Sequence, residues 1–497
     1  MSESGFRGYL ETLKAAGELV SIEDDVSWNL QASAVTMMAN RTDDCIPVFE
    51  SVHDGNKVGA CLVGDPYRGS RSRPWSRIAR TLGMAPELDG KTYYRRMIDR
   101  LQNPIEPDYV SEDEAPCKDV VKTGANADLL AFPWPYIHAG DGGRYSNLHT
   151  LLSPSYDRSW TDWAYHRAMV HDSKTASVLF LAGEHTPNQY YYQYETQDEP
   201  MPVTIAVGVD PAIQCTTVMQ MPTTRPLSEF AGGLKGEPIE LVACETNDMV
   251  VPASAELVIE GRIQPNVRRD EGPFGDYFGY MHGPRRSMPM FEIDVITHRK
   301  RPYIPFCVEG SGVGYGTNTT SSLDIACLGP NATLGLRVGG FSVEQCVPWR
   351  YSPRSVYVIS TDVPHEGYLH NLANFVFTTP GTLHADFLVL VDDTVNAFDP
   401  REVLESIALH ANPDTDFHQF GIETMPEVPM NVYQTPAEKG NIQTGTSKTK
   451  TAKAFIDATG SGERFSGDHD SRRRAQETLR DAGVDATQLD LLPADRG

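Results

Sequence analysis

The chain has 497 residues, with 43 basic and 67 acidic side chains and a formal charge of −24. This length predicts about three domains and a core large enough to fold without disulfide or metal staples. The negative charge would repel a phosphate backbone, so we expect no nucleic-acid partner.

Two further features bear on location. No run approaches the roughly 20 apolar residues of a membrane span, and the first residues, MSESGFRGYL, lack the basic and apolar regions of a secretory signal. The eight cysteines are scattered and form no C-x-x-C pair. We therefore expect a cytoplasmic protein with free thiols and no membrane partner.

The first predicted element is a helix with Phe6, Tyr9, Leu10 and Leu13 on one face, which ends at Gly17. A polar, acidic stretch around 102–127 marks the end of the first domain. The middle third contains short β-rich runs separated by Gly, Pro and Asn, a pattern typical of a barrel or sandwich. These runs lie at 178–181, 203–209, 239–244, 257–263 and 290–296.

After about residue 320 the pattern predicts a third domain of the α/β type. Strands are expected at 356–360 and 387–391. Asp399-Pro400 is a typical helix start, followed by apolar positions at Val403, Leu404 and Ile407. The polar tail from 445 onward contains one short predicted helix near 472–481.

The glycine-rich run EGSGVGYG at 309–316 is not a dinucleotide fingerprint. The third required glycine falls on Tyr315 or Thr317, depending on the starting glycine. We interpret the run as a flexible loop that lines a pocket. Phosphate-loop, zinc-protease and serine-hydrolase motifs do not occur in the sequence.

Three segments place charged or imidazole groups inside apolar, β-rich sequence. They are TDWAYHRAMVHD at 161–172 with GEH at 183–185, SEFAG at 228–232, and EGPFGD at 271–276. Burying such groups is costly unless they pair or bind a ligand. A structural interpretation stays open, in which Arg167 forms a structural ion pair and His185 is a hydrogen-bonded core histidine.

The functional interpretation starts from the turn that Pro-Phe-Gly favours between Glu271 and Asp276. Such a turn could bring both carboxylates to one cavity, where repulsion keeps a proton on one of them near neutral pH. That acid could donate a proton, while Arg167 binds an anionic substrate through its planar fork. These residues predict an enzyme that acts on a carboxylate with a borrowed cofactor.

Several motifs in one order resemble the UbiD family of reversible decarboxylases, which use prenylated FMN. The motifs are LAFPWPYIH at 130–138, DGGRY at 141–145, RAMVH at 167–171, AGGLKG at 231–236, VPA at 251–253, EG at 260–261, EGPFG at 271–275 and IDAT at 456–459. The resemblance implies an N-terminal α/β domain (1–120), a central split-barrel domain that binds prenylated FMN (121–318), a C-terminal α/β dimerisation domain (319–460) and a tail (461–497).

The resemblance also implies a catalytic set of Arg167, Glu271 and Asp276. Arg167 would hold the substrate carboxylate and contact the flavin, Glu271 would deliver the proton after CO₂ leaves, and Asp276 would tune Glu271. The sequence allows the two acids to exchange these roles.

By the same resemblance, a divalent metal, Mn²⁺ or Mg²⁺, would take Asp162, His185 and Glu229 as ligands, with K⁺ beside the cofactor phosphate. The residues expected to bind the cofactor are Asp162, Trp163, Ala164, Tyr165, Arg167, Glu184, His185, Thr216, Thr217, Val218, Met219 and Glu229. Three of the site residues depart from the family pattern, with Asp162 replacing Asn, Glu184 replacing Gln and Asp276 replacing Glu.

The expected substrate is an aromatic or heteroaromatic carboxylic acid that releases CO₂. The glycine-rich loop and the tyrosines at 190–192 favour a large fused-ring acid such as phenazine-1-carboxylate. A pyrrole, indole, phenolic or acrylic acid is the alternative within this class. A non-catalytic flavin-binding protein and a metal-dependent hydrolase are alternatives of other classes. The expected partners are a flavin prenyltransferase, which supplies the cofactor, and further copies of the chain in a homodimer or larger oligomer.

Overall fold

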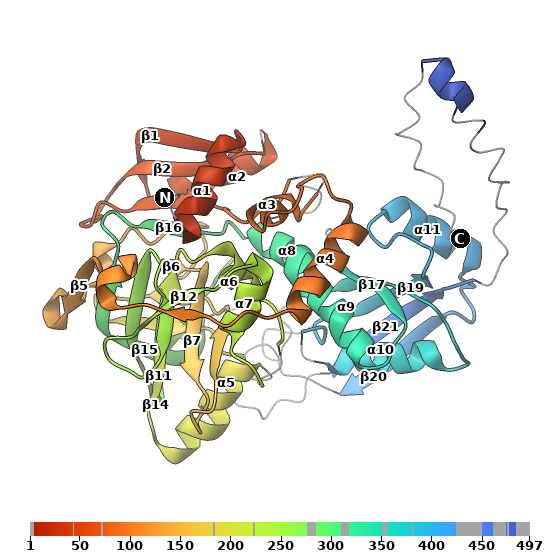
Figure 1. Cartoon of the computed structure of the whole chain (residues 1–497). Coiled ribbons are helices and arrows are strands. Elements are labelled where there is room, and N and C mark those ends of the chain that lie inside the picture. Colours follow the sequence, from red (N-terminus) through yellow and green to blue (C-terminus); the bar gives the residue numbers. More distant parts are fainter. Residues whose placement is uncertain are drawn as a thin grey trace.

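The computed structural model describes residues 4–42, 44–70, 73–181, 184–221, 224–275, 285–309, 318–349, 355–379, 381–423, 450–460, 474 and 477–483. The chain forms three domains; in the view of Figure 1 the N-terminal strands lie above the central domain, and the C-terminal sheet lies to its right. The described residues do not include Asp276, Gly183 or the loop at 310–316, so the expectations for these parts of the chain are not tested.

The N-terminal domain is an α/β unit around a four-stranded sheet in the order β1-β2-β3-β16. Its elements are α1 (Gly5–Ala15), β1 (Leu19–Ser27), α2 (Gln31–Arg41), β2 (Ile46–His53), β3 (Cys61–Gly64), α3 (Ser76–Thr81), α4 (Gly90–Gln102) and β16 (Tyr303–Phe306). Since β16 pairs in parallel with β3, the chain returns to this domain after it has built most of the central one.

The first predicted helix is confirmed in α1. Phe6, Tyr9, Leu10 and Leu13 are buried on its inner face. Gly17, two residues after the helix, has a φ of +70°, a left-handed conformation that glycine adopts without steric cost at a helix end.

The central domain is built on a nine-stranded sheet in the order β6-β9-β10-β15-β14-β11-β7-β8, with β5 beside β15. The strands are β5 (Val120–Thr123), β6 (Arg144–Ser146), β7 (His149–Pro154), β8 (Thr161–Ala164), β9 (Ala168–Val170), β10 (Thr175–Val178), β11 (Met201–Val207), β14 (Leu257–Glu271) and β15 (Arg286–His298). All neighbouring pairs run antiparallel, as expected for a barrel-type sheet. The register between β14 and β15 shifts twice. Such irregularities bend strands, and the sheet curls into a half barrel.

One predicted strand is wrong in extent. The run at 178–181 was expected to be a strand, but β10 ends at Val178. Phe180 instead packs edge-on against His166 and Tyr190, with ring centroids 5.1 and 6.0 Å apart. The backbone N–H of Leu179 still donates to the Arg167 carbonyl at 3.1 Å, so packing between side chains takes over from strand pairing only beyond Leu179.

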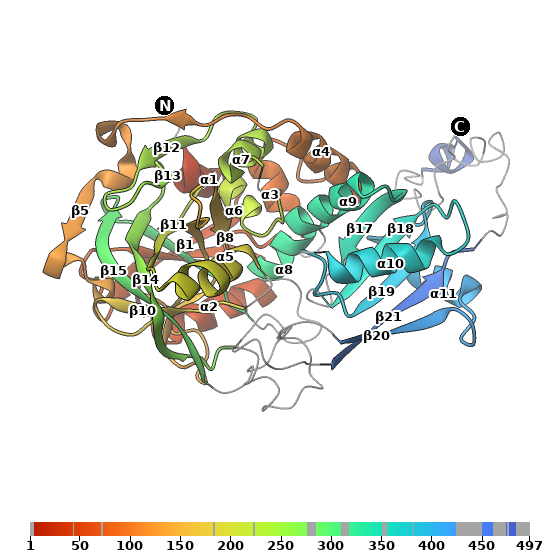
Figure 2. The ribbon, with the colours of Figure 1, turned by 90° about the horizontal axis from the view of Figure 1, so that it is seen from below.

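Short helices and a small sheet surround the central strands. They are η1 (Glu112–Glu114), η2 (Pro116–Lys118), η3 (Gly124–Asn126), η4 (Leu129–Ala131), α5 (His185–Gln189), the π-helical turn η5 (Tyr190–Tyr194), η6 (Glu195–Gln197), α6 (Pro211–Thr216) and α7 (Leu227–Lys235), with a three-stranded sheet of β4 (Asp108–Tyr109), β12 (Glu240–Ala243) and β13 (Val250–Pro252). In Figure 2, α7 lies near α4 of the N-terminal domain, and the two helices are in contact.

The C-terminal domain is an α/β unit whose five-stranded sheet has the order β17-β18-β19-β21-β20. Its elements are α8 (Thr319–Leu323), the π-helical turn η7 (Asp324–Leu328), α9 (Gly329–Val338), β17 (Val343–Pro348), β18 (Val356–Thr361), α10 (Tyr368–Thr378), β19 (Phe387–Asp392), α11 (Pro400–His410), β20 (Phe417–Glu423) and β21 (Lys450–Ala458). Figure 2 shows α9 and α10 lying along one face of this sheet.

The predicted start of α11 is confirmed, because the Asp399 side chain accepts a hydrogen bond from the backbone N–H of Arg401 at 2.9 Å. Val403 is buried as expected, but Leu404 is 58% exposed because Val403 and Ser406 form the inner face. Of the predicted tail helix, the described part is helical at 477–481.

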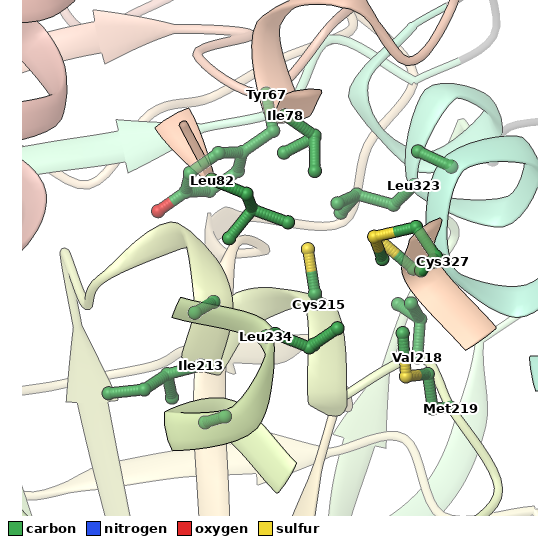
Figure 3. Packing of buried hydrophobic residues seen from close by; sticks show 14 of the residues in the cluster. Tyr67, Ile78, Leu82, Ile213, Cys215, Val218, Met219, Leu234, Leu323 and Cys327 are labelled. Atoms are coloured by element: carbon green, nitrogen blue, oxygen red, sulfur yellow. The ribbon is translucent and has the colours of Figure 1, made fainter. Parts of the chain in front are cut away.

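A continuous apolar core joins the three domains. Figure 3 shows Cys215 of the central domain packed among Leu82 of the N-terminal domain and Leu323 and Cys327 of the C-terminal one. Beside this core, the hydroxyl groups of Tyr93 and Tyr94 on α4 donate hydrogen bonds to carbonyl oxygens of η7, at 3.0 and 2.8 Å. The domain junction is therefore a packed interior.

Two simple findings complete the fold. All eight cysteines are free thiols. In the parts of the chain that the structure describes, none of the helices combines the length and the apolar character required to cross a membrane.

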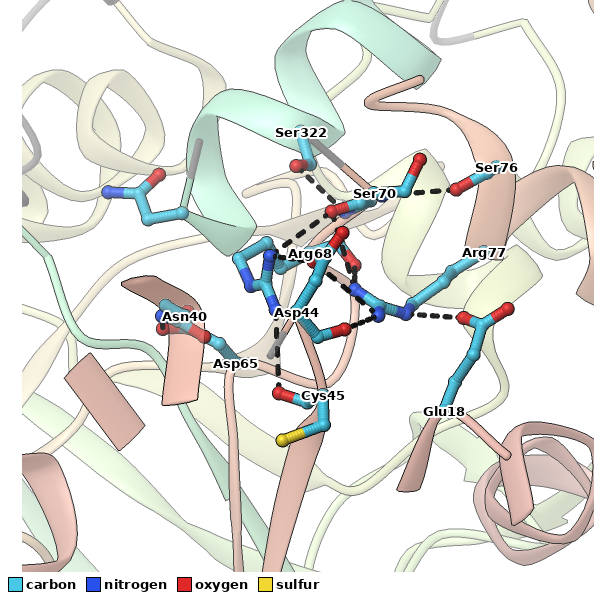
Figure 4. A network of polar contacts seen from close by, with 12 residues as sticks. Glu18, Asn40, Asp44, Cys45, Asp65, Arg68, Ser70, Ser76, Arg77 and Ser322 are labelled. Carbon is cyan, nitrogen blue, oxygen red and sulfur yellow. Dashed lines mark hydrogen bonds and ion pairs between the residues drawn. The ribbon is translucent and has the colours of Figure 1, made fainter. Parts of the chain in front are cut away.

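A buried polar network holds the N-terminal domain together (Figure 4). At its centre are Arg68 and Arg77, each 1% exposed. The Nε of Arg77 donates to a Glu18 carboxylate oxygen at 2.7 Å, and its other nitrogens donate to backbone carbonyl oxygens of Arg68, Gly69 and Asp44. The network satisfies a guanidinium that would otherwise be costly to bury.

We predict that Arg77→Met lowers the free energy of unfolding by about 3–5 kcal/mol, because it leaves buried acceptors without their donor. Chemical denaturation measures this change. The matched control is Arg401→Met, since the Arg401 side chain is 77% exposed and we expect a change within about 0.5 kcal/mol. Equal effects of the two substitutions would contradict the assignment.

Candidate active site

A buried ion pair joins two segments of the central domain. Arg167 lies directly before β9, and Glu271 is the last residue of β14. Arg167 Nε donates to Glu271 Oε1 at 2.9 Å, and Nη2 donates to Oε2 at 3.2 Å. The side chains are 13% and 1% exposed, so the fork-to-carboxylate pair is largely shielded from water.

Two aromatic rings complete the surroundings of the pair. The Tyr145 hydroxyl donates to Glu271 Oε1 at 3.2 Å, and the Arg167 guanidinium carbon lies 4.4 Å from the Phe274 ring centroid. The Tyr145 and Phe274 rings are themselves 4.4 Å apart. Together they hold both charged groups in one orientation and exclude water from one side.

The backbone around Glu271 is clamped by the loop that precedes β6. Asp141 accepts hydrogen bonds from the backbone N–H groups of Gly275 and His138, at 2.8 and 2.9 Å. Gly142 N–H donates to the Pro273 carbonyl at 2.7 Å. Burial raises the pKa of Asp141, while hydrogen bonds from the two N–H groups and the nearby charge of Arg167 oppose the rise.

Glycine is required at two positions of this clamp. Gly272 has a φ of +84°, which side chains with a Cβ rarely adopt. A Cβ on Gly142 would lie 2.0 Å from the Gly272 carbonyl oxygen, a backbone atom that cannot rotate away. The close approach of these two backbones therefore determines where Glu271 lies.

Of the three expected catalytic residues, the structure brings Arg167 and Glu271 together. Asp276 lies outside the described residues, so its role stays a prediction. The sequence analysis missed Tyr145, Asp141 and Phe274 as supports, although they lie inside the quoted motifs at 141–145 and 271–275. A buried hydroxyl next to a carboxylate could not be found from spacing alone.

A cavity borders the segment that leads into Arg167. It encloses about 720 Å³ of space not filled by atoms, part of it open to solvent. Its described lining residues are Trp160, Thr161, Asp162, Trp163, Ala164, Tyr165, His166, Glu184, His185, Thr217, Val218, Met219, Gln220, Met221, Arg225 and Leu227.

Most of the expected cofactor-binding residues line this one cavity. Nine of the twelve do so, and the exceptions are Arg167, Thr216 and Glu229. Thr216 is fully buried, and its hydroxyl donates to the Ile213 carbonyl at 2.8 Å. The tyrosines expected to stack on the substrate do not line the cavity. The Tyr190 and Tyr191 hydroxyls donate to backbone carbonyls of their own surroundings.

The charges in the cavity wall are set by burial. Burial lowers the pKa of His166 to about 4, so this imidazole is neutral at pH 7. Burial also raises the pKa of Asp162, whose carboxylate accepts a hydrogen bond from Thr186 at 2.8 Å. Glu184 lies 3.7 Å from His166 and 3.9 Å from His384 of the C-terminal domain. The wall thus includes a contact between domains.

The expected metal ligands are only partly assembled. Asp162 Oδ1 and His185 Nδ1 lie 4.0 Å apart and share the cavity. Glu229 does not line it, and its carboxylate accepts a hydrogen bond from Arg225 at 2.7 Å. Among the described side chains, no three His, Cys, Asp or Glu residues are placed to hold a metal ion. Two of the three expected donors therefore fit, and the third is engaged elsewhere.

We predict that Gly142→Ala abolishes activity or reduces it severely, because the added methyl group displaces the Gly272 carbonyl and with it Glu271. The control is Gly335→Ala on α9, where a Cβ meets nothing within 4 Å. We expect this helix substitution to raise stability by about 0.5–1 kcal/mol. Thermal unfolding and turnover distinguish the two variants, and a Gly142→Ala enzyme with full turnover would contradict the clamp.

Comparison with known proteins places this arrangement in a family. Three family models match the chain, described as the N-terminal, Rift-related and C-terminal domains of 3-octaprenyl-4-hydroxybenzoate carboxy-lyase (UbiD), over residues 10–101, 108–312 and 343–458. Among curated proteins, pyrrole-2-carboxylic acid decarboxylase of Pseudomonas aeruginosa is 30% identical over 445 residues, covering 85% of this chain and 86% of that protein.

Solved structures give the same result. The UbiD-class enzyme HmfF of Pelotomaculum thermopropionicum, in complex with FMN, is 27% identical with a TM-score of 0.77, covering 94% of this chain and 97% of that one. An evolved dimeric form of HmfF, in complex with prenylated FMN, is 26% identical with a TM-score of 0.75, covering 95% and 98%. All three domains, in the same order and over nearly the whole length, match one group of proteins. The chain belongs to the UbiD family of carboxy-lyases.

Proposed function

We propose that the chain is a prenylated-FMN-dependent decarboxylase of an aromatic or heteroaromatic carboxylic acid. The observation that carries the proposal is the buried Arg167–Glu271 pair, whose arginine directly follows a residue of the cavity wall, His166. Family membership and the flavin complexes of HmfF support the cofactor. A non-catalytic flavin protein would have no need for a desolvated guanidinium and acid held in one orientation.

The side chains that line the cavity fit a flavin nucleotide in their chemistry. Indole and phenol rings of Trp160, Trp163 and Tyr165, together with two methionines, offer flat and polarisable contacts to a ring system. When bound, prenylated FMN would supply the electron sink that loss of CO₂ from an sp² carbon requires.

In the proposed mechanism, Arg167 binds the substrate carboxylate in fork geometry. Arg167 then leaves its ion pair with Glu271. A buried carboxylate without its cation favours the protonated form. Glu271 takes up this proton from solvent and delivers it to the ring carbon after CO₂ leaves, so that each turnover consumes one proton. Tyr145 holds Glu271 in place, and Phe274 keeps the guanidinium in the plane in which it meets the substrate.

The finer assignments are proposals that rest on the sequence. Asp162 and His185 would provide an oxygen and a nitrogen donor to Mn²⁺ or Mg²⁺, with Glu229 as the third ligand and K⁺ nearby. Asp276 would tune Glu271. A flavin prenyltransferase would supply the cofactor, and the active form would be a homodimer or larger homo-oligomer in the cytoplasm.

For the substrate, we propose a fused-ring acid such as phenazine-1-carboxylate first and a smaller pyrrole, indole, phenolic or acrylic acid second. Two of the three tyrosines that favoured a large substrate, Tyr190 and Tyr191, donate hydrogen bonds to backbone carbonyls instead, and the P. aeruginosa relative is named for a pyrrole acid. Co-expression with a flavin prenyltransferase, mass analysis of the cofactor and a screen of these acids for CO₂ release decide between them. A metal-dependent hydrolase would instead turn over without flavin.

We predict that Glu271→Gln lowers the turnover number by roughly 10²–10⁴-fold, the usual contribution of a general acid, because the amide has no acidic proton to deliver. Flavin content should stay at the wild-type level, since Glu271 does not line the described cavity wall. Glu405→Gln, on the exposed face of α11, is the matched control and should keep full activity. Wild-type turnover in Glu271→Gln would refute the assigned role.

A further inference from the structure

The charges of the described cavity wall are unevenly distributed. Asp162 and Glu184 contribute carboxyl groups, and burial keeps His166 neutral at pH 7 by lowering its pKa. Among the described lining residues, Arg225 is the only arginine, and none of them is a lysine. An anion that enters this cavity therefore meets one permanently positive side chain.

Arg225 forms an ion pair with Glu229 at the edge of the cavity. It lies two residues before α7, and its Nη1 donates to Glu229 Oε2 at 2.7 Å, one helical turn along the chain. The Arg225 side chain is 56% exposed and that of Glu229 13%, so the guanidinium keeps a solvated side from which it can turn to another anion. A stronger anion can therefore replace the Glu229 carboxylate.

We propose that Arg225 binds the phosphate group of the flavin nucleotide and exchanges its Glu229 partner for that phosphate. This inference rests on the proposed function. A phosphate dianion beside two carboxyl groups needs a cation, and a guanidinium meets its oxygens with two parallel N–H···O bonds. Arg225 is the described lining residue with that chemistry.

The exchange has a consequence for Glu229. Once Arg225 turns to the phosphate, the Glu229 carboxylate has lost its cation and is available to a divalent ion that also uses Asp162 and His185. Phosphate and metal binding are then coupled, because each favours the same rearrangement, and the coupling is reciprocal.

The first test titrates the full-length protein, expressed without a prenyltransferase and kept in a chelator, with FMN and with riboflavin, which lacks the phosphate. Flavin fluorescence reports binding without turnover. Arg225→Gln should weaken FMN binding by roughly 10–100-fold, as expected for loss of a charged hydrogen-bonded contact, and leave riboflavin binding unchanged. Glu229→Gln should bind FMN at least as tightly as the wild type, because Arg225 no longer has a competing partner.

The control and the second test use the same protein. Arg401→Gln removes an exposed, ion-paired arginine of the C-terminal domain and should change neither affinity. After the chelator is removed, titration with Mn²⁺ should show tighter binding in the presence of FMN for the wild type, and no such gain for Arg225→Gln or for the riboflavin complex.

Three outcomes overturn the inference in distinguishable ways. If Arg225→Gln weakens FMN and riboflavin equally, the residue supports the cavity but does not bind phosphate. If it changes neither affinity while the enzyme still decarboxylates, only the role of Arg225 is lost. If the wild type binds neither flavin, the proposed function fails as well.

Discussion

The ion pair between Arg167 and Glu271 places the strictest demand on the central domain. Two charges that are 13% and 1% exposed are stable only with good geometry and additional hydrogen bonds, and a buried pair of this kind adds little to stability compared with apolar packing. In the function proposed above its value is chemical, because a desolvated guanidinium would accept the carboxylate of the substrate. The curled sheet, the Tyr145 hydroxyl, the Phe274 ring and the glycine clamp all serve to hold this one pair.

The cavity beside the pair depends on the junction of the three domains. Val218 and Met219 line the cavity and belong to the core in which Cys215, Leu323 and Cys327 meet (Figure 3). Glu184 adds a polar contact, since it reaches His384 of the C-terminal domain. A change in how the domains pack would therefore move residues of the cavity wall, although none of these core residues takes part in the reaction.

The sequence predicted those parts of the fold that depend on residues close together in the chain, and it failed where distant residues interact. The α1 face with Phe6 and Leu13, and the Asp399 cap of α11, are decided by neighbours within a few residues, and both expectations were confirmed. The end of β10 at Val178 and the pairing of β16 with β3 depend on residues far away in the chain. No local pattern contains that information, because strand pairing and aromatic packing are chosen in competition with the whole chain.

The sequence by itself determined which chemical groups the site contains, namely a guanidinium, a carboxyl group in a Pro-Gly turn, and donors at Asp162 and His185, as well as the family that combines them. Only the tertiary structure decided how these groups are paired. It pairs Arg167, directly before β9, with Glu271 of β14, and these two strands are not neighbours in the sheet. It also brings the Tyr145 hydroxyl to Glu271 and pairs Glu229 with Arg225. The reason is physical: residue type sets what a side chain can bind, whereas burial and distance, which arise only when remote segments meet, set what it does bind.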